Sequence, residues 1–303
     1  MEVINSCPLC GENQYEDLYI TRDRHYGIKG TYNVMKCCNC SLVFINPVPS
    51  TKELTNLYPE WFYAYQPYEK RLNNAIKKMI RRILLFKEST SDPKFDKPGR
   101  ILDIGCGNGS FLNEMKGWEK FGVEINAQAA KIGNDTGEMN IFAGDLIDAK
   151  YPSNFFDYIR SNHSFEHISN PNETLREIHR ILKPDGKLLI GVPNINSLYA
   201  RFFKKYWWFL GAPVHVFNYS DKTLKQMLKK HGFNINKLNY NSDCYGLVGS
   251  IQIYLNRNCG KLSEDGVFVK SRIFRILAQL AARLCDLFNT GDSIEVIATK
   301  AKV

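Results

Sequence analysis

The sequence predicts an α/β protein built on a mostly parallel sheet, and three observations carry this prediction. From about residue 99 onward, short apolar segments typical of strands alternate with stretches of helical apolar spacing. The first of these strands ends in a glycine-rich turn, Gly105-Cys-Gly-Asn-Gly109, and a helical pattern follows it directly. Acidic residues end the first two strands, at Asp103 and Glu124. This arrangement favours a nucleotide-type ligand at the carboxyl edge of the sheet.

The first strand ends at Asp103, and the helix after it begins at Ser110. Between them, Gly105, Gly107 and Gly109 stand at alternate positions. Glycines at this spacing let the backbone turn sharply and approach a ligand that any Cβ would block. Ser110 stands where a dinucleotide-binding fold needs its third glycine, which disfavours a dehydrogenase.

The second and third strands add two further polar positions. Residues 121–126 form the second strand, in which Glu124 can accept hydrogen bonds from ribose hydroxyls. Residues 139–146 contain a short third strand followed by Gly-Asp-Leu. There the carboxylate of Asp145 and the backbone amide of Leu146 are placed to read an adenine edge.

The remaining elements complete the alternation. A fourth strand at 155–161 is followed by an amphipathic helix from Leu175, a Pro-Asp-Gly turn at 184–186 and a fifth strand. Residues 234–240 form another strand, and residues 291–300 are predicted to be the antiparallel last strand of seven.

These segments, in this order, resemble the class I S-adenosylmethionine (AdoMet)-dependent methyltransferases over residues 99–240. The resemblance implies a Rossmann-like, seven-stranded methyltransferase sheet. It assigns the amino-acid end of AdoMet to Asp103 and the three glycines, the ribose to Glu124, and the adenine to Asp145 and Leu146. Ser161, at the end of the fourth strand, is assigned to the same cofactor site.

The N-terminal cysteines predict a metal-binding ribbon. Two Cys-x-x-Cys pairs lie 26 residues apart and can supply four thiolates to one Zn²⁺, namely Cys7, Cys10, Cys37 and Cys40. Cys38 does not fit this spacing. Such a small module is too short to fold without its metal, so we expect the zinc to be structural. The sparse cysteines favour a reducing, cytoplasmic compartment over a disulfide scaffold.

The chain order resembles a methyltransferase-23 or ubiquinone-methyltransferase-like bacterial group with a zinc-ribbon front end. Its recurrent opening is matched by the four cysteines and by Pro47 and Pro49. We expect a zinc ribbon at 1–50, a helical linker region at 51–98 with helices at 51–58 and 68–88, and a methyltransferase domain at 99–303. Members are often linked to sugar, polysaccharide or quinone methylation.

Charge and composition narrow the partners. The 40 basic against 31 acidic residues invite a nucleic-acid hypothesis. Much of the excess lies on one face of the predicted helix 68–88, which is more typical of a solvated surface. The segment after the fourth strand lacks the Asn-Pro-Pro-Tyr-like motif of base-amino methyltransferases. Nucleic acid is therefore not favoured. No apolar run reaches the length of a membrane span, and no signal peptide is predicted.

Two inserts are predicted in the methyltransferase domain, at 196–219 and 241–290. The first is dense in aromatic residues and matches a family lid segment through Trp208, Pro213 and His215. Aromatic planes suit a sugar ring or a flat quinone, although Trp207 and Trp208 could instead only pack the insert against the core. The second insert carries an amphipathic helix at 271–288, which could pack on the core, dimerise or contact a membrane surface peripherally.

A hydroxyl acceptor needs a general base, and histidine suits neutral pH. The candidates, in order of preference, are His215 in the aromatic insert, His163 after the fourth strand, and His167, which could equally be structural. Glu166-His167 resembles the Glu-His of ubiquinone-type O-methyltransferases. In those enzymes a glutamate that precedes the pair assists the reaction. In this chain His163 stands at that position, which puts metal assistance in doubt.

The sequence thus predicts an AdoMet-dependent methyltransferase that acts on a small-molecule or glycan hydroxyl, in cell-surface polysaccharide or related biosynthesis. Three alternatives stay open: a quinone-type O-methyltransferase at a membrane surface, an RNA methyltransferase, and a catalytically silent AdoMet-binding protein. The oligomeric state is not predicted.

Overall fold

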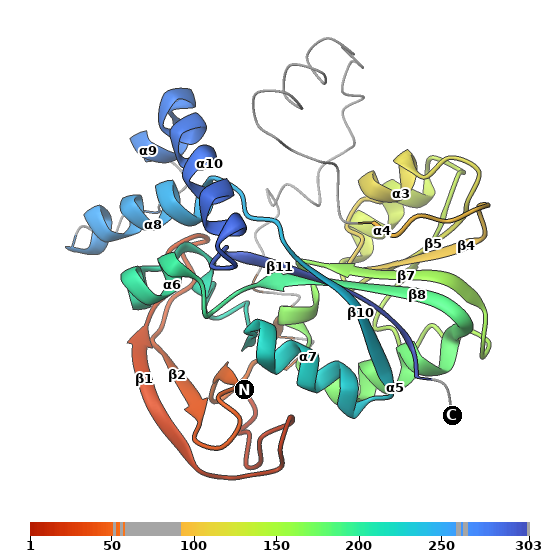
Figure 1. The fold of residues 1–303 in the computed structure, drawn as a ribbon, viewed down its shortest axis with the longest axis horizontal. Coiled ribbons are helices and arrows are strands. Elements are labelled where there is room, and N and C mark those ends of the chain that lie inside the picture. Colours follow the sequence, from red (N-terminus) through yellow and green to blue (C-terminus); the bar gives the residue numbers. More distant parts are fainter. Residues whose placement is uncertain (51–52, 55–56, 58–91, 259–261, 263–265, 302–303) are drawn as a thin grey trace.

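The computed structural model describes residues 1–303 except 51–52, 55–56, 58–91, 259–261, 263–265 and 302–303 (Figure 1). The predicted helix 68–88 with its basic face, and most of the predicted helix 51–58, lie outside the described residues.

A seven-stranded sheet forms the centre of the molecule, with the strand order β10-β11-β8-β7-β4-β5-β6. The strands are β4 (Arg100–Ile104), β5 (Glu119–Glu124), β6 (Asn140–Ala143), β7 (Phe156–Asn162), β8 (Leu182–Pro193), β10 (Phe233–Tyr240) and β11 (Ser293–Lys300). The five strands from β4 to β8 pair in parallel, whereas β11 is antiparallel to both β8 and β10. The predicted Rossmann-like sheet with an antiparallel last strand is confirmed.

Helices cover both faces of this sheet. In Figure 1, α3 (Ser110–Glu114) and α4 (Ala127–Asn134) lie on one side, and α5 (Pro171–Ile181) and α7 (Asp221–Lys230) lie on the other. Helix α5 begins with Pro171 at a position where its missing N–H is not needed, and it buries Leu175 and Ile178. A capping box between Ser220 and Thr223 starts α7.

One sequence prediction is refined at the start of β8. The Pro-Asp-Gly turn at 184–186 does not precede the strand but interrupts its pairing. Phe156 of β7 pairs with Leu182, and Tyr158, only two residues on, pairs with Lys187. The residues between Leu182 and Lys187 therefore bulge out of the ladder while both flanking segments stay paired.

The N-terminal region forms a second, four-stranded sheet in the order β1-β2-β3-β9. Its strands are β1 (Tyr15–Thr21), β2 (Tyr32–Cys37), β3 (Val43–Ile45) and β9 (Phe217–Asn218). Strand β9 comes from the aromatic insert, where Phe217 pairs with Phe44 of the ribbon. Phe44, Phe217 and Tyr219 are buried in the same core cluster as the central sheet. The N-terminal sheet is thus packed onto the domain of the central sheet and not tethered beside it.

The two inserts lie together at one end of the sheet (Figure 1). The first contains α6 (Leu198–Phe203), η3 (Lys204–Tyr206) and η4 (Trp208–Leu210). The second contains α8 (Tyr245–Leu255), η5 (Asn256–Asn258), α9 (Val267–Lys270) and α10 (Arg272–Leu287). A short turn, η2 (Phe165–His167), follows β7. Helix α8 contacts both α6 and η4, so the inserts form one helical layer.

Candidate functional site

The glycine-rich turn has the conformation that its sequence predicts. Gly105, Gly107 and Gly109 all have positive φ, at 73°, 54° and 76°. A Cβ on Gly105 would lie 2.5 Å from the Cβ of Ser164, and one on Gly109 would lie 2.3 Å from the Sδ of Met139. At Gly105 both the backbone conformation and the close approach disfavour a larger residue, whereas at Gly109 the neighbour is the end of a flexible methionine and the positive φ is the main constraint. The turn is thus a cradle of bare backbone at the carboxyl edge of β4.

Asp103 is the next-to-last residue of β4 and is paired with a buried arginine. Its Oδ1 lies 3.3 Å from Nη1 of Arg160, whose guanidinium stacks on the Phe111 ring at 3.9 Å. Burial raises the pKa of Asp103 to about 6, although Arg160 opposes this shift. This pairing places the carboxylate beside the glycine turn, where the amino-acid end of AdoMet is expected.

Glu124 ends β5 and holds the same turn from the next strand. Its Oε2 accepts from the Gly107 amide at 2.8 Å, and its Oε1 accepts from the Asn126 amide at 2.9 Å. Burial raises its pKa above the ordinary glutamate value. Each carboxylate oxygen keeps a second lone pair that can accept from a ribose hydroxyl.

The other predicted cofactor residues differ in their exposure. Asp145 and Leu146 follow β6, and Leu146 is buried while Asp145 is half-buried, with its Oδ1 accepting from the Ile147 amide at 3.1 Å. Ser161 is fully buried, and its hydroxyl lies 2.6 Å from that of Ser164. Ser164 also donates to the Ile104 carbonyl. Sequence reasoning missed Ser164, which supports the glycine turn from behind. Cofactor contact by Ser161 stays a prediction.

A cavity of 590 Å³ opens beside this edge of the sheet. It is lined by the turn after β7, the aromatic insert, α8, α9 and a loop of the ribbon: His25, Tyr26, Asn162, His163, Glu166, His167, Trp208, Phe209, Gly211, Val214, His215, Asp243, Tyr245 and Val269. All three histidines predicted as base candidates therefore line one cavity, although they come from two separate segments.

Glu166 is the charged centre of this cavity. Its side chain is 2% exposed, and among the described residues neither carboxylate oxygen has a hydrogen-bond partner. His163 Nδ1 lies 3.7 Å and His167 Nε2 lies 3.9 Å from Oε1, which are ion-pair distances. Burial alone would raise the pKa of Glu166, but its interactions with the three surrounding histidines lower it to about 2. The carboxylate is thus held ionised.

The histidines respond differently to this carboxylate. Desolvation would lower the pKa of His163, whose side chain is 41% exposed, but its interaction with Glu166 outweighs this and raises the pKa. Burial, reinforced by the charge of His167, lowers the pKa of His215 to about 3. His163 also has a left-handed backbone, with φ of 53°, a conformation that a non-glycine residue adopts at a cost. The electrostatics therefore favour His163 over His215 as a base.

The neighbouring histidines are held by backbone carbonyls. His215 Nδ1 lies 2.8 Å from the Phe209 oxygen, and His167 Nδ1 lies 2.8 Å from the Val214 oxygen. The two rings meet edge to face at 4.7 Å. Each Nδ1 therefore donates to a carbonyl, which fixes the ring orientation.

The two tryptophans of the aromatic insert have separate roles. Trp207 is 1% exposed, and its indole N–H donates to Asp292 Oδ1 at 2.8 Å, so it packs the insert onto the core. Trp208 lines the cavity and stacks on Tyr245 with ring centroids 5.9 Å apart. Packing is thus the role of Trp207, and a ring-shaped acceptor stays a prediction for Trp208.

The ribbon contributes two cavity residues that sequence reasoning missed. Asp23 accepts from the backbone amides of His25, Tyr26 and Ile28 at 2.8 to 2.9 Å, which fixes the loop after β1. His25 Nε2 then lies 3.0 Å from the Trp208 carbonyl oxygen. The only sequence signal was an Asp followed within five residues by a histidine and a tyrosine, which is too common to interpret.

Among the described residues, two groups of side chains have the spacing that a metal ion requires. The Sγ atoms of Cys7, Cys10, Cys37 and Cys40 lie within 4.8 Å of one another, with Cys7–Cys40 and Cys10–Cys37 at 3.5 Å. Tetrahedral Zn–S bonds of about 2.3 Å place sulfurs about 3.8 Å apart, so this group fits zinc. Cys38 is exposed and lies outside the group. Glu166, His167 and His215 also meet the distance condition.

Comparison with known proteins agrees with this geometry. Residues 68–238 match the family described as "Methyltransferase domain". The demethylmenaquinone methyltransferase of Geobacillus sp. is 25% identical over 202 residues, which cover 56% of this chain and 84% of the relative. The malonyl-[acyl-carrier protein] O-methyltransferase of Halalkalibacterium halodurans is 29% identical, over 42% of this chain and 51% of the relative.

Other relatives are matched over a smaller part of their length. An uncharacterized Methanocaldococcus jannaschii protein is 29% identical over 63% of its own length, and the ajmaline N-methyltransferase of Rauvolfia serpentina is 28% identical over 43%. A solved structure of Haemonchus contortus phosphoethanolamine N-methyltransferase 2 in complex with S-adenosyl-L-methionine has a TM-score of 0.50 and 15% identity. That likeness covers 86% of this chain and 62% of the other. With the family match over more than half of its residues, this chain belongs to the methyltransferase-domain family of AdoMet-dependent enzymes.

Proposed function

We propose that this protein transfers a methyl group from AdoMet to a hydroxyl of a small-molecule or glycan acceptor bound in the 590 Å³ cavity. The observation that carries the proposal is the position of His163. It follows β7 directly, beside the strand whose glycine turn forms the cofactor cradle, and it lines the cavity together with the ionised Glu166.

The residues of the cofactor cradle fit AdoMet. The glycine turn offers backbone that a Cβ would obstruct, and two buried carboxylates, Asp103 and Glu124, lie at the carboxyl ends of β4 and its neighbour β5. Bound AdoMet would supply an activated methyl group on a sulfonium centre, so the protein has to contribute little beyond orientation and proton removal.

The proton of the acceptor hydroxyl goes to His163 in this proposal. Its Nε2 lies 3.3 Å from the Ser293 hydroxyl and can exchange that neighbour for an acceptor hydroxyl. Its Nδ1 faces Glu166, whose negative charge stabilises the imidazolium that forms. His215, with its pKa near 3, is too weak a base and instead shapes the cavity.

We propose further that the four-cysteine group holds a structural zinc ion. The four sulfurs have the number, type and spacing of a closed zinc site. The metal would fix the β1–β3 sheet and hence the loop that brings His25 and Tyr26 to the cavity. Polysaccharide biosynthesis remains the expected context because the wider family resemblance points to it.

The test uses methyl-labelled AdoMet and a panel of nucleotide sugars, catechols, reduced quinones and bulk RNA. We expect label transfer to a hydroxyl compound, with loss of transfer and retention of AdoMet binding in His163→Asn. Transfer to RNA, or no transfer to any compound in the panel despite tight AdoMet binding, would contradict the proposed acceptor class. A requirement for an added divalent ion after chelation would replace the His163 base by a metal-assisted mechanism.

A further inference from the structure

Helix α10 turns its apolar side toward solvent. Ile273, Leu277, Leu280, Leu284 and Leu287 recur along one side of the helix, with 42 to 77% of each residue exposed. Ile276 and Phe288 widen this side, at 50 and 75% exposure. Every residue of α10 after Arg272 that is exposed is apolar. A single exposed leucine needs no explanation, but a continuous apolar helix face does.

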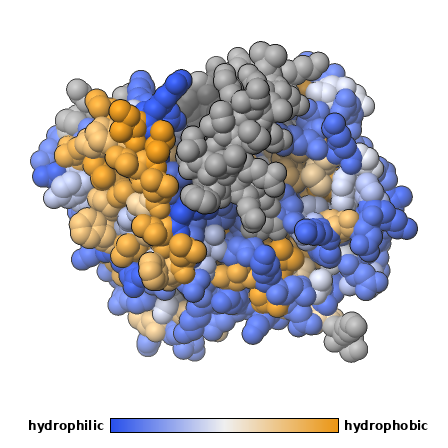
Figure 2. Space-filling model, turned by 45° about the horizontal axis from the view of Figure 1, so that its top comes forward, coloured by the Kyte–Doolittle hydropathy of each residue, from blue (hydrophilic) through white to orange (hydrophobic). Residues whose placement is uncertain are grey.

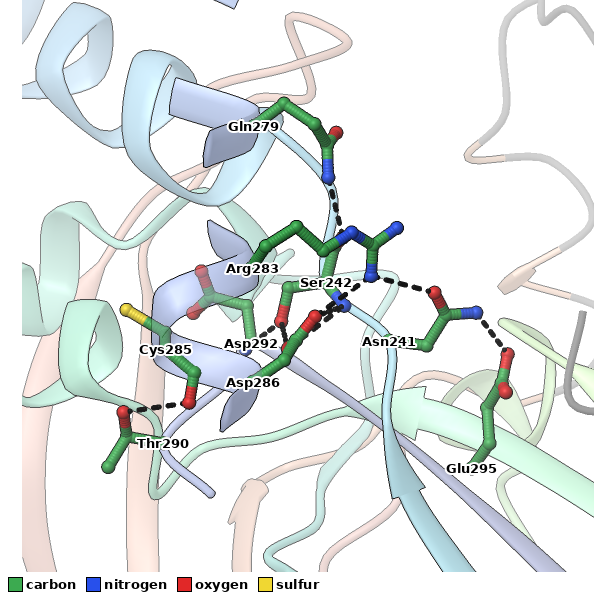
Figure 3. Close-up of polar contacts among 9 residues, drawn as sticks. All are labelled: Asn241, Ser242, Gln279, Arg283, Cys285, Asp286, Thr290, Asp292 and Glu295. Carbon is green, nitrogen blue, oxygen red and sulfur yellow. Dashed lines mark hydrogen bonds and ion pairs between the residues drawn. The ribbon is translucent and has the colours of Figure 1, made fainter. Parts of the chain in front are cut away.

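The polar side of α10 is fixed inward, so this orientation is built into the fold (Figure 3). Gln279 donates to the Ser242 carbonyl at 3.1 Å. Arg283 contacts both Asp286 at 2.9 Å and Asn241 at 3.3 Å. Asp286 in turn accepts from the Ser242 hydroxyl at 2.6 Å. Rotating the helix to bury its leucines would break this whole network.

Helix α6 extends the apolar surface. Its first amide, that of Leu198, donates to the Thr290 carbonyl just beyond α10 at 2.9 Å, so the two helices are adjacent there. Leu198 and Phe202 of α6 are 47 and 76% exposed. Figure 2 shows hydrophobic surface gathered in one broad area on the side of the molecule formed by α8, α9 and α10. We call the exposed apolar residues of α6 and α10 the apolar face.

The helices of the two inserts carry mainly basic charge, although the exposed Asp243 stands just before α8. Across α6, η3, η4, α8, η5, α9 and α10, Asp286 is the only acidic residue, and it is turned inward. The same elements expose Arg201, Lys204, Lys205 and Arg272. Cations beside a broad apolar face are typical of a helix that lies in the headgroup region of an anionic bilayer.

We propose that the apolar face docks this protein onto an anionic lipid surface. A second copy of the chain is the competing occupant, but an isologous dimer would bring together two surfaces whose exposed charges are mainly basic. The face is also wider than the narrow seam of a two-helix coiled coil. Among the described residues, no helix combines the length and apolarity needed to cross a bilayer, so the contact is peripheral.

The two helices that pack against α10 form part of the acceptor cavity. Tyr245 of α8 and Val269 of α9 line it, and both helices pack against α10. Docking would therefore hold the acceptor half of the site beside the bilayer. This consequence rests on the proposed function, whereas the docking itself does not.

Vesicle co-sedimentation of the full chain tests the docking. We expect binding to phosphatidylcholine vesicles with about 30% phosphatidylglycerol and at least tenfold weaker binding to pure phosphatidylcholine, with strong weakening by salt.

The triple variant Leu277→Gln/Leu280→Gln/Leu284→Gln should lose more than about tenfold in vesicle affinity. Lys204→Glu/Lys205→Glu should lose the preference for phosphatidylglycerol, at about fivefold per charge. Ile147→Gln, at the same 42% exposure as Leu280 but next to the far edge strand β6, is the matched control and should bind like wild type.

An unchanged AdoMet affinity by calorimetry shows that each variant is folded. Equal sedimentation of wild type and the triple leucine variant would overturn the proposal. So would a wild-type dimer that becomes monomeric in the leucine variant and does not bind vesicles, because a second copy would then cover the face. Failure of methyl transfer with vesicle binding intact would refute only the proposed function.

Discussion

The cofactor half and the acceptor half of the site are built in different ways. The cofactor cradle comes from consecutive elements, β4 to β6, and each of its polar residues stands at a strand end. The acceptor cavity instead combines a loop of the ribbon, the turn after β7, the aromatic insert and two later helices. A local motif thus fixes the cofactor, whereas only long-range packing assembles the acceptor site. The two halves should therefore respond separately to mutation.

Loss of the proposed zinc ion should have the largest effect, and this effect should fall on the acceptor half. Cys37→Ser takes one thiolate from the four-cysteine group, so we expect loss of bound zinc and a fall of more than ~3 kcal/mol in the free energy of unfolding of the ribbon. AdoMet affinity should stay within about twofold, because no ribbon residue lies in the cofactor cradle. Metal analysis, thermal unfolding and calorimetry measure these three quantities. Cys38→Ser, at the exposed neighbouring cysteine, is the control and should keep its zinc. Equal zinc content in both variants would refute the assigned ligand set.

Loss of the proposed base should come next. His163→Asn keeps a residue that tolerates the left-handed backbone, and it should lower kcat by about 10²- to 10⁴-fold without changing AdoMet affinity. The pH profile makes this specific. His163 acts only when neutral and its pKa is raised, so activity should rise with pH through a midpoint above the ordinary histidine value. Glu166→Gln removes the charge that raises this pKa, and the midpoint should move to lower pH. An unmoved midpoint in Glu166→Gln would show that another group titrates.

A glycine substitution should damage the cofactor half alone. In Gly105→Ala the new Cβ would lie 2.5 Å from the Ser164 Cβ at a φ of +73°, and we expect AdoMet affinity to fall ~10- to 100-fold. Gly137 has a similar φ of +70° but open space around its Cβ position. Gly137→Ala therefore carries the conformational cost without the clash and should bind AdoMet normally. Equal loss in both variants would assign the effect to backbone strain and not to the cradle.

The smallest effect should follow from loosening the ribbon loop. Asp23→Ala removes the acceptor of three backbone N–H groups, which should lower stability by ~1–3 kcal/mol and raise the KM for the acceptor severalfold. Asp17→Ala, on strand β1 of the same ribbon, serves as the control because its side chain is exposed. An acceptor KM unchanged in Asp23→Ala would exclude the ribbon loop from acceptor binding.

The sequence predicts the cofactor half well because its signals are local. Strand, glycine turn and helix follow one another within fifteen residues. The requirement for a glycine at position 105 and the place of Asp103 near the strand end can therefore be predicted from the local sequence. The partner of Asp103 could not be read, since Arg160 comes from β7, which pairs beside β4 only in the folded sheet. The cysteine spacing likewise predicts the four-sulfur group that the structure brings together.

The acceptor half could be predicted only in part because tertiary contacts decide it. The sequence identified His163, His167 and His215 as candidates and ranked His215 first. It could not reveal the low pKa of His215, because that pKa depends on burial of the ring beside His167 in the folded protein. It could not show that Phe217 would pair with Phe44 and so join the ribbon to the insert. It also could not show that α10 exposes its apolar side, because the inward anchor at Ser242 and Asn241 lies on another segment.

Calorimetric titration of AdoMet into Glu124→Ala and His163→Asn compares the two halves most directly. Glu124 holds the glycine turn through the Gly107 amide, whereas His163 lines only the acceptor cavity. We predict that Glu124→Ala binds AdoMet at least about tenfold more weakly than wild type and that His163→Asn binds it with unchanged affinity. Wild-type affinity in Glu124→Ala, or equal losses in both variants, would contradict a cofactor site held by the β4–β6 edge and built separately from the acceptor site.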